Sequence, residues 1–113
     1  MEWLIAKNKC VRIYSSQKKL HFLHYNASGR NHGLTISKDA FLKMEDVSIS
    51  PGSSLMLESN VFLSNYAHTI KLTKYCFTRD KQRCDGGFFL FTEAEWQAFW
   101  TKIRLDIQAK LNQ

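Results

Sequence analysis

The sequence predicts an α+β domain built from two antiparallel β-sheets, each followed by a helix, so that a strand–strand–strand–helix unit occurs twice. The chain has 113 residues, of which 44% are apolar, enough for one domain with a real core. Short alternating apolar and polar segments, typical of strands, recur in both halves. We therefore expect a single domain of two repeats, 1–50 and 51–113, related as a pseudo-dimer.

The first half contains three predicted strands and a short helix. The strands lie at 9–14, 20–25 and 33–36. Polar residues 15–18 are expected to form the turn between the first two. Ser37 is a predicted N-cap, and the helix that follows should end near Ser48, because Pro51-Gly52 is the clearest break in the chain.

The second half repeats this order and ends in a longer helix. Its predicted strand segments lie at 55–57, 60–63, 69–75 and 88–91. A charged loop is expected over 78–87. The capping box Thr92-Glu93-Ala94-Glu95 predicts a helix from 93 to about 111. Its apolar residues recur at helical spacing: Trp96, Phe99, Trp100, Ile103 and Ile107.

Two motifs indicate that the halves are diverged copies. Leu20-x-Phe22-x-x-Tyr25 recurs as Ile70-x-Leu72-x-x-Tyr75, and 37–41 recurs in kind as 92–96. The offset between matching residues grows from 50 to 55. This places the difference in length in the loop after each tyrosine, where insertions are tolerated.

No catalytic or metal-binding motif is present in the sequence. The four histidines form no HExxH or HxH pattern, and no glycine-rich phosphate loop or nucleophile elbow occurs. Three cysteines, an odd number without a CxxC pair, argue against both a disulfide framework and a thiolate zinc site. We therefore expect no enzyme activity, no cofactor, no metal and a reducing compartment.

Composition bears on the location and the partner. The N-terminal residues lack the basic start and apolar stretch of a secretory signal, and no apolar run approaches the roughly 20 residues that span a bilayer. These features predict an intracellular protein that is neither secreted nor membrane-bound. The net charge of +6 favours an anionic partner.

Basic and aromatic residues are paired on the predicted outer strand faces and loops, as in surfaces that hold unpaired nucleic acid. Cations there follow the phosphates while aromatic rings stack on bases. The candidate binding residues are Lys7, Lys9, Arg12, Tyr14, Lys18, Lys19, Tyr25, Arg30, His32, Lys71, Lys74, Tyr75, Arg79 and Lys81. Single-stranded DNA or RNA is the expected partner. The alternative at this point is a solvated charged face whose aromatic residues only pack the sheet edge.

Two stretches also resemble the PC4-like family of transcriptional coactivators. Residues 33–41 are similar to the family pattern G-I-S-L-N-P-E-Q-W, and residues 7–13 to its first strand, K-x-R-Y-V-S-V. The resemblance implies curved antiparallel sheets that bind single-stranded or melted DNA, and dimers paired through helices. For this chain it implies a monomeric pseudo-dimer or a homodimer that acts with transcription or replication proteins in the nucleus, or the host nucleus if viral.

The chain departs from the family pattern at several basic positions. Tyr14 replaces an Arg, Leu23 and Thr73 stand at the strand-two Arg position, and only Lys19 keeps its hairpin-loop charge. Strands followed by a helix with an early Trp also resemble a pleckstrin-homology domain, which would bind anionic lipid and would have strand rather than helix over 38–47. A third alternative is a protein-interaction module that docks through exposed aromatic residues of the C-terminal helix.

Overall fold

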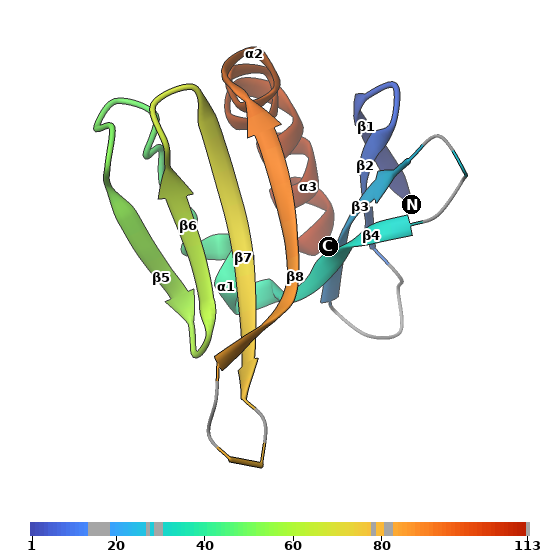
Figure 1. The fold of residues 1–113 in the computed structure, drawn as a ribbon. Coiled ribbons are helices and arrows are strands. Elements are labelled where there is room, and N and C mark those ends of the chain that lie inside the picture. Colours follow the sequence, from blue (N-terminus) through green and yellow to red (C-terminus); the bar gives the residue numbers. More distant parts are fainter. Residues whose placement is uncertain (14–18, 27, 29–30, 78, 81–82, 113) are drawn as a thin grey trace.

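The protein, seen here as a computed structural model, consists of two four-stranded antiparallel meanders, each followed by a helix (Figure 1). The structure describes residues 1–13, 19–26, 28, 31–77, 79–80 and 83–112. The first sheet contains β1 (Glu2–Ala6), β2 (Lys9–Ile13), β3 (Lys19–Tyr25) and β4 (Asn31–Ser37). The second contains β5 (Ser54–Glu58), β6 (Val61–Asn65), β7 (Thr69–Phe77) and β8 (Arg83–Thr92). The predicted α+β class with two antiparallel sheets is confirmed.

The prediction of three strands in each half is wrong, because each half has four; in the first half the additional strand, β1, precedes the predicted first strand. The register between β1 and β2 shifts between Leu4 and Ala6, where the strand contains a bulge. Trp3 and Ile5 pack against the core, while Leu4 between them points outward and is 68% exposed. Because the outward residue Leu4 is apolar as well, residues 3–6 lack the alternation of apolar and polar residues by which strands are recognised in a sequence.

The predicted loop over 78–87 is also too long, because β8 begins at Arg83. Residues 83–87 of β8 pair with the end of β7, across a register shift between Lys74 and Tyr75. Charged residues and two glycines conceal this part of the strand, since both are depleted in typical strands.

The expectation of no disulfide is contradicted in the same region. Cys76 is disulfide-bonded, and its Cα partner across the β7–β8 ladder is Cys84, whereas Cys10 is free and buried. The cysteine count is odd because Cys10 is free and lies elsewhere in the fold. An odd count therefore did not exclude a disulfide.

The mid-chain helix is shorter than expected. Helix α1 (Lys38–Leu42) begins at the predicted N-cap, where the Ser37 hydroxyl accepts a hydrogen bond from the Ala40 amide, but it ends well before Ser48. Met44 and Val47 reach the core from an irregular segment instead. A helix at this place does not fit the pleckstrin-homology arrangement, which would have strand there.

The C-terminal helix runs over the predicted range and contains one π-helical turn. It comprises α2 (Glu93–Ala98), the π segment η1 (Phe99–Ile103) and α3 (Arg104–Leu111), and the predicted capping box is present at Thr92 and Glu95. The Arg104 amide donates to the Phe99 carbonyl, five residues back. The wider turn keeps Phe99 and Ile107 both fully buried.

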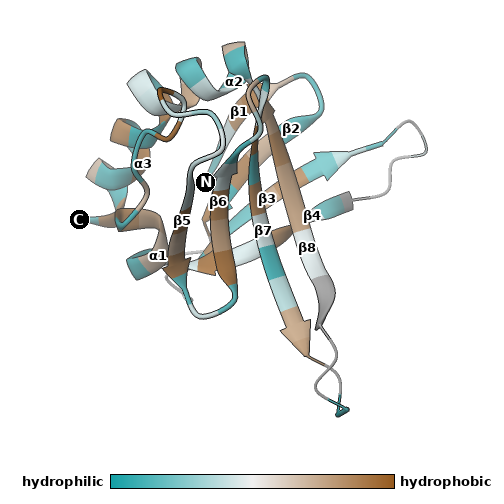
Figure 2. Cartoon of the chain, turned by 60° about the vertical axis from the view of Figure 1, so that its left-hand side comes forward, coloured by the Kyte–Doolittle hydropathy of each residue, from teal (hydrophilic) through white to brown (hydrophobic). Residues whose placement is uncertain are grey.

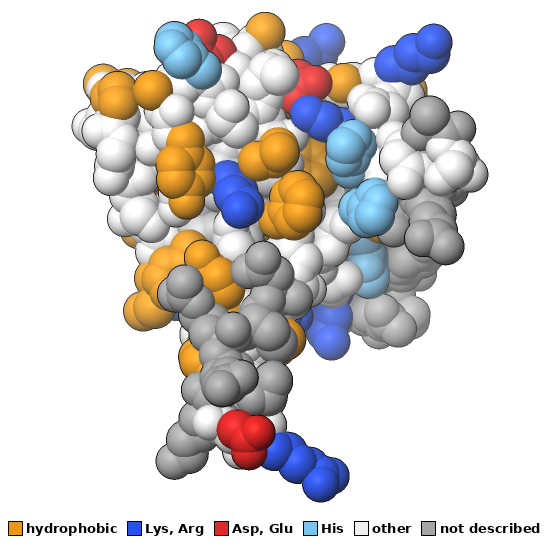
Figure 3. All heavy atoms as spheres, in the orientation of Figure 1, with side chains coloured by type: hydrophobic (Ala, Val, Ile, Leu, Met, Phe, Trp, Pro, Cys, Tyr) orange, Lys and Arg blue, Asp and Glu red, His pale blue; other side chains and the backbone are white. Residues whose placement is uncertain are grey.

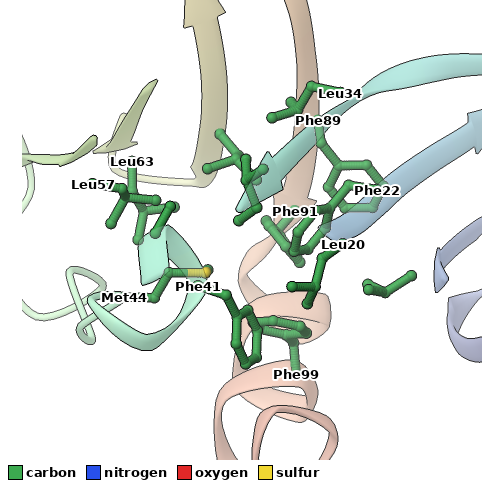
Figure 4. Packing of buried hydrophobic residues seen from close by; sticks show 14 of the residues in the cluster. Leu20, Phe22, Leu34, Phe41, Met44, Leu57, Leu63, Phe89, Phe91 and Phe99 are labelled. Carbon is green, nitrogen blue, oxygen red and sulfur yellow. The ribbon is translucent and has the colours of Figure 1, made fainter. Parts of the chain in front are cut away.

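One core joins the two halves. Figure 4 shows Phe22 of β3 close to Phe89 and Phe91 of β8, with Phe41 of α1 and Phe99 of η1 beside them. The rings of Phe22 and Phe89 have centroids 5.4 Å apart. Full burial of such a side chain contributes about 1.5–3 kcal/mol. Because these rings come from both sheets, the core belongs to the whole chain.

The C-terminal helix lies between the sheets, and its π segment and first turns contact strands of both (Figure 1). Figure 2 shows bands of hydrophobic and hydrophilic residues along this helix, as expected for a helix with one buried face. Among the described residues, no helix has the length and apolar character needed to cross a bilayer.

The sheets meet where β4 and β8 pass close to one another, at Gly33 and Gly87. A Cβ on Gly87 would lie 2.4 Å from the Gly33 carbonyl oxygen, and one on Gly33 would lie 1.8 Å from the Phe22 carbonyl oxygen. Both glycines have positive φ, 153° and 130°. Only glycine fits such a close backbone approach.

Candidate nucleic-acid interface

The outward side of the second sheet exposes a cluster of aromatic residues around a lysine. Along β7 the buried residues Ile70 and Leu72 alternate with Lys71, Thr73 and Tyr75, which point away from the core. Phe62 of β6 and Phe88 of β8 are the two cross-strand partners of Thr73. We call Phe62, Lys71, Thr73, Tyr75 and Phe88 the aromatic face.

The residues of the aromatic face contact one another. The Lys71 Nζ lies 5.3 Å from the centroid of the Phe88 ring, within the range of a cation–π interaction. The rings of Phe62 and Tyr75 have centroids 5.7 Å apart. Thr73 is only 4% exposed although it points outward, whereas Phe88 is 41% exposed. The large side chains on either side of Thr73 therefore form the surface that solvent meets.

Figure 3 shows this side of the molecule, with hydrophobic side chains gathered over the second sheet and a lysine among them. Met56 of β5, which is 61% exposed, extends the apolar surface beyond Phe62, and Leu90 of β8 extends it beside Lys71. Contiguous exposed apolar surface of this kind is typical of a binding site.

The outward side of the first sheet has a different character. Arg12 forms an ion pair with Glu2 at 2.6 Å. Cys10 lies on the same side but is buried, with a hydrogen bond to Tyr25; burial raises the pKa of its thiol and the Glu2 carboxylate raises it further, so the thiol stays protonated. This side has a single described aromatic residue, Tyr25.

His21 lies on that side of the first sheet, at the register position that Lys71 has in the second. The His21 Nδ1 lies 2.8 Å from the Thr35 hydroxyl. Burial lowers the pKa of His21, and the neighbouring Lys19 ammonium lowers it further. The imidazole is therefore neutral at neutral pH.

Two predicted binding lysines instead connect the two halves. The Lys9 ammonium forms an ion pair with Glu95 at 2.6 Å, and the two side chains are 12% and 18% exposed. Burial raises the pKa of Glu95, but hydrogen bonds from Lys9 and the Thr92 amide outweigh it and hold this pKa below its ordinary value. The Lys74 ammonium donates to the Thr35 carbonyl at 3.3 Å. Lys9 and Lys74 therefore do not belong to the candidate interface.

The other predicted residues are dispersed over the surface. Lys7 and Arg79 are exposed in turns, and Lys19 is exposed at the start of β3. His32 is exposed on β4, with its Nε2 3.3 Å from the Asn26 amide nitrogen. The remaining candidates lie outside the described residues: Tyr14, Lys18, Arg30 and Lys81. Of the predicted residues, only Lys71 and Tyr75 belong to the aromatic face.

Sequence reasoning missed Phe62 and Phe88, although a signal was present. The run Phe88-Phe89-Leu90-Phe91 is continuously apolar, so a strand with one buried face must direct two of these side chains outward. Phe62 likewise lies between Val61 and Leu63, both fully buried. An apolar residue at the polar position of an alternating strand was therefore the available signal.

The C-terminal helix does not provide an exposed aromatic docking surface. Trp96 and Phe99 are buried, and the guanidinium of Arg104 covers the half-buried Trp100 ring at 3.9 Å. Among the described residues, no group of three His, Cys, Asp or Glu side chains is arranged to hold a metal ion. No family model, curated protein or solved structure matches this chain.

Proposed function

We propose that the protein binds single-stranded nucleic acid on the aromatic face, without catalysis. The observation that carries the proposal is the outward position of Phe62, Tyr75 and Phe88 around Lys71. Aromatic rings on a sheet stack on bases of any sequence, and a lysine among them attracts the phosphate backbone. In a duplex the base faces are already stacked on one another, so this surface favours unpaired strands.

The proposal includes the role implied by the resemblance to the PC4-like family. Two four-stranded meanders, each followed by a helix that begins at a Ser or Thr cap, agree with a single-chain counterpart of such a dimer. On this interpretation the protein acts on melted DNA in transcription or replication in a nucleus. The same surface chemistry accepts RNA, and the choice between the two is an outcome of the test below.

Fluorescence anisotropy tests the proposal directly. Labelled 20-nucleotide strands of deoxythymidine and uridine, and a 20-base-pair duplex, are titrated with the protein at several salt concentrations. We expect the single strands to bind more tightly than the duplex, with affinity that falls as salt rises because bound counterions are released. Absence of binding to every strand at low salt would contradict the proposal and leave the exposed apolar surface to a protein partner.

A further inference from the structure

A pocket adjoins the aromatic face, where β6 turns into β7. It has a volume of about 340 Å³, at the lower end of the range for small-ligand sites. Phe62 and Tyr75 line it on the side of the aromatic face, and Tyr66 lines it as well. The pocket is therefore continuous with the surface on which we propose that a strand lies.

Phe62 of β6 and Tyr66, the residue directly after this strand, both line the pocket. Phe62 and Ser64 point to the outward side of β6, and Tyr66 lines the same pocket from the turn that follows. At about 3.3 Å per residue, the Cα atoms of Phe62 and Tyr66 are roughly 13 Å apart. This spacing leaves room for one flat ring between the two aromatic side chains.

Two hydroxyls also line the pocket. Ser54 and Ser64 are cross-strand partners, and their Oγ atoms lie 2.9 Å apart. Each hydroxyl can donate or accept a hydrogen bond, so the pair can meet a donor or an acceptor on a ligand. Aromatic rings together with a pair of hydroxyls of this kind suit a nucleobase of any identity.

The turn that contains Tyr66 is held by hydrogen bonds of the buried Asn65 side chain. Asn65 is 1% exposed; its Nδ2 donates to the Val47 carbonyl at 2.7 Å, and its Oδ1 accepts from the Ala67 amide at 2.8 Å. Ala67 holds a positive φ of 71°, which is uncommon for a residue with a side chain. Tyr66 itself is 60% exposed. These hydrogen bonds hold the turn in place, and the Tyr66 ring stays exposed to a ligand. A backbone that is ordered before binding lowers the entropy cost of binding.

We infer that this pocket receives one unpaired base from the strand bound on the aromatic face. The inference rests on the proposed function and adds to it a defined subsite. The strand crosses Phe88 and Lys71, and one base leaves the line of stacked bases to sit between Tyr66 and Phe62. Ser54 and Ser64 then hydrogen-bond its edge.

The test combines Tyr66→Ala with strands that lack one base. Anisotropy measures the affinity of the wild type and Tyr66→Ala for a 12-nucleotide deoxythymidine strand, and for a set of the same strands with a single abasic position moved along the sequence. We expect Tyr66→Ala to weaken binding of the intact strand roughly 5- to 100-fold, the effect of losing one stacked base. One abasic position should weaken the wild type by a similar factor and have little effect on Tyr66→Ala.

Two variants control for side effects. Tyr66→Phe keeps the ring and should bind within about twofold of the wild type, while Leu105→Ala removes an exposed apolar residue of α3 and should bind like the wild type. Thermal melting followed by circular dichroism checks that Tyr66→Ala remains folded.

The outcomes separate the subsite from the function. If Tyr66→Ala binds the strand as tightly as the wild type, the subsite is overturned and the proposed function stands. The same conclusion follows if, at every position, an abasic site weakens Tyr66→Ala by the same factor as it weakens the wild type. If the wild type binds no strand at low salt, the proposed function fails and the subsite with it.

Discussion

The two sheets have closely matching registers but different outward sides. In the first sheet one cross-strand row runs through Cys10, Leu23 and Gly33. The equivalent row of the second sheet runs through Phe62, Thr73 and Phe88. The second sheet therefore has two aromatic rings where the first has a buried thiol and a glycine. The backbone arrangement is repeated, while the surface that we propose for binding is present on one copy.

The neighbouring row shows the same contrast in charge. His21 stands between Arg12 and Thr35, as Lys71 stands between Ser64 and Leu90. Burial and the Lys19 ammonium lower the pKa of His21 and keep it neutral, whereas the Lys71 ammonium lies over the Phe88 ring. Arg12 is already engaged by Glu2. A repeated fold thus does not imply a repeated binding site.

The largest effect should follow from disturbing the junction that the two halves share. Gly87→Ala places a Cβ 2.4 Å from the Gly33 carbonyl oxygen of the other sheet, so β4 and β8 cannot keep their close approach. We expect a loss of roughly 3 kcal/mol or more in the free energy of unfolding, measured by urea denaturation. Gly52→Ala is the matched control: its φ is 86° but no atom lies within 4 Å of the added Cβ, so it should cost about 1–2 kcal/mol. Equal stability of the two variants would contradict this junction.

A double substitution on the aromatic face should remove the difference in strand binding that we propose between the two sheets. Phe62→Ala with Phe88→Ala removes two stacking rings, and we expect affinity for single strands to fall on the order of 100-fold or more. Leu4→Ala, at a 68% exposed position on the outward side of the first sheet, should leave affinity unchanged. Anisotropy measures both variants. A comparable loss for Leu4→Ala would show that both sheets bind.

Replacing Lys9 tests whether a lysine paired inside the fold contributes to stability and not to strand binding. Lys9→Met leaves the mostly buried Glu95 carboxylate without its cation, and the free energy of unfolding should fall by about 2 kcal/mol at pH 7. Strand affinity of the folded variant should not change. Exposed Lys7→Met is the control for stability. The interpretation fails if Lys9→Met stays as stable as the wild type and binds strands more weakly.

The same pair predicts a dependence of stability on pH. Because the pKa of Glu95 is lower in the folded chain than its ordinary 4.5, its contribution is present above pH 4.5 and is lost as pH falls through the folded-state pKa. Urea denaturation from pH 7 to pH 3 should show a smaller acid-induced loss for Lys9→Met than for the wild type. A parallel loss in both would contradict the role of the ion pair.

The smallest effect is expected from the single cation of the aromatic face. Lys71→Gln should weaken strand binding several-fold at low salt, and the slope of log affinity against log salt should decrease by about 0.7, the value for one phosphate contact on a single strand. Lys102→Gln, which removes an exposed lysine of the C-terminal helix, should change neither quantity. An unchanged slope for Lys71→Gln would remove this lysine from the interface.

The fold was predictable from the sequence where local patterns were regular. The capping box at Thr92 and the alternation along 69–75 gave the long helix and the central strand of the second sheet correctly. The strand β1 was missed because its outward residue Leu4 is apolar, and the helix α1 was overextended because Met44 and Val47 are buried from an irregular segment. In both cases tertiary packing outweighed the local pattern.

The candidate site was less predictable than the fold. Charge marked Lys9, Lys71 and Lys74 alike, yet only Lys71 lies on the aromatic face, since the partners of Lys9 and Lys74 come from the other half of the chain. Contacts between residues so distant in sequence leave no local signature. Phe62 and Phe88 were overlooked for the opposite reason, because apolar residues are expected to be buried.

The π-helical turn at Phe99–Ile103 bears on how the chain tolerates changes in length. Deleting one residue from a regular helix rotates everything beyond it by about 100°, which would turn a buried face toward solvent. Here the Arg104 amide already pairs with a carbonyl five residues back, so removing the exposed Thr101 would shorten that bond to the regular four-residue span. Phe99 and Ile107 would then still face the core, and the helix would accept the loss of a residue that other positions would not.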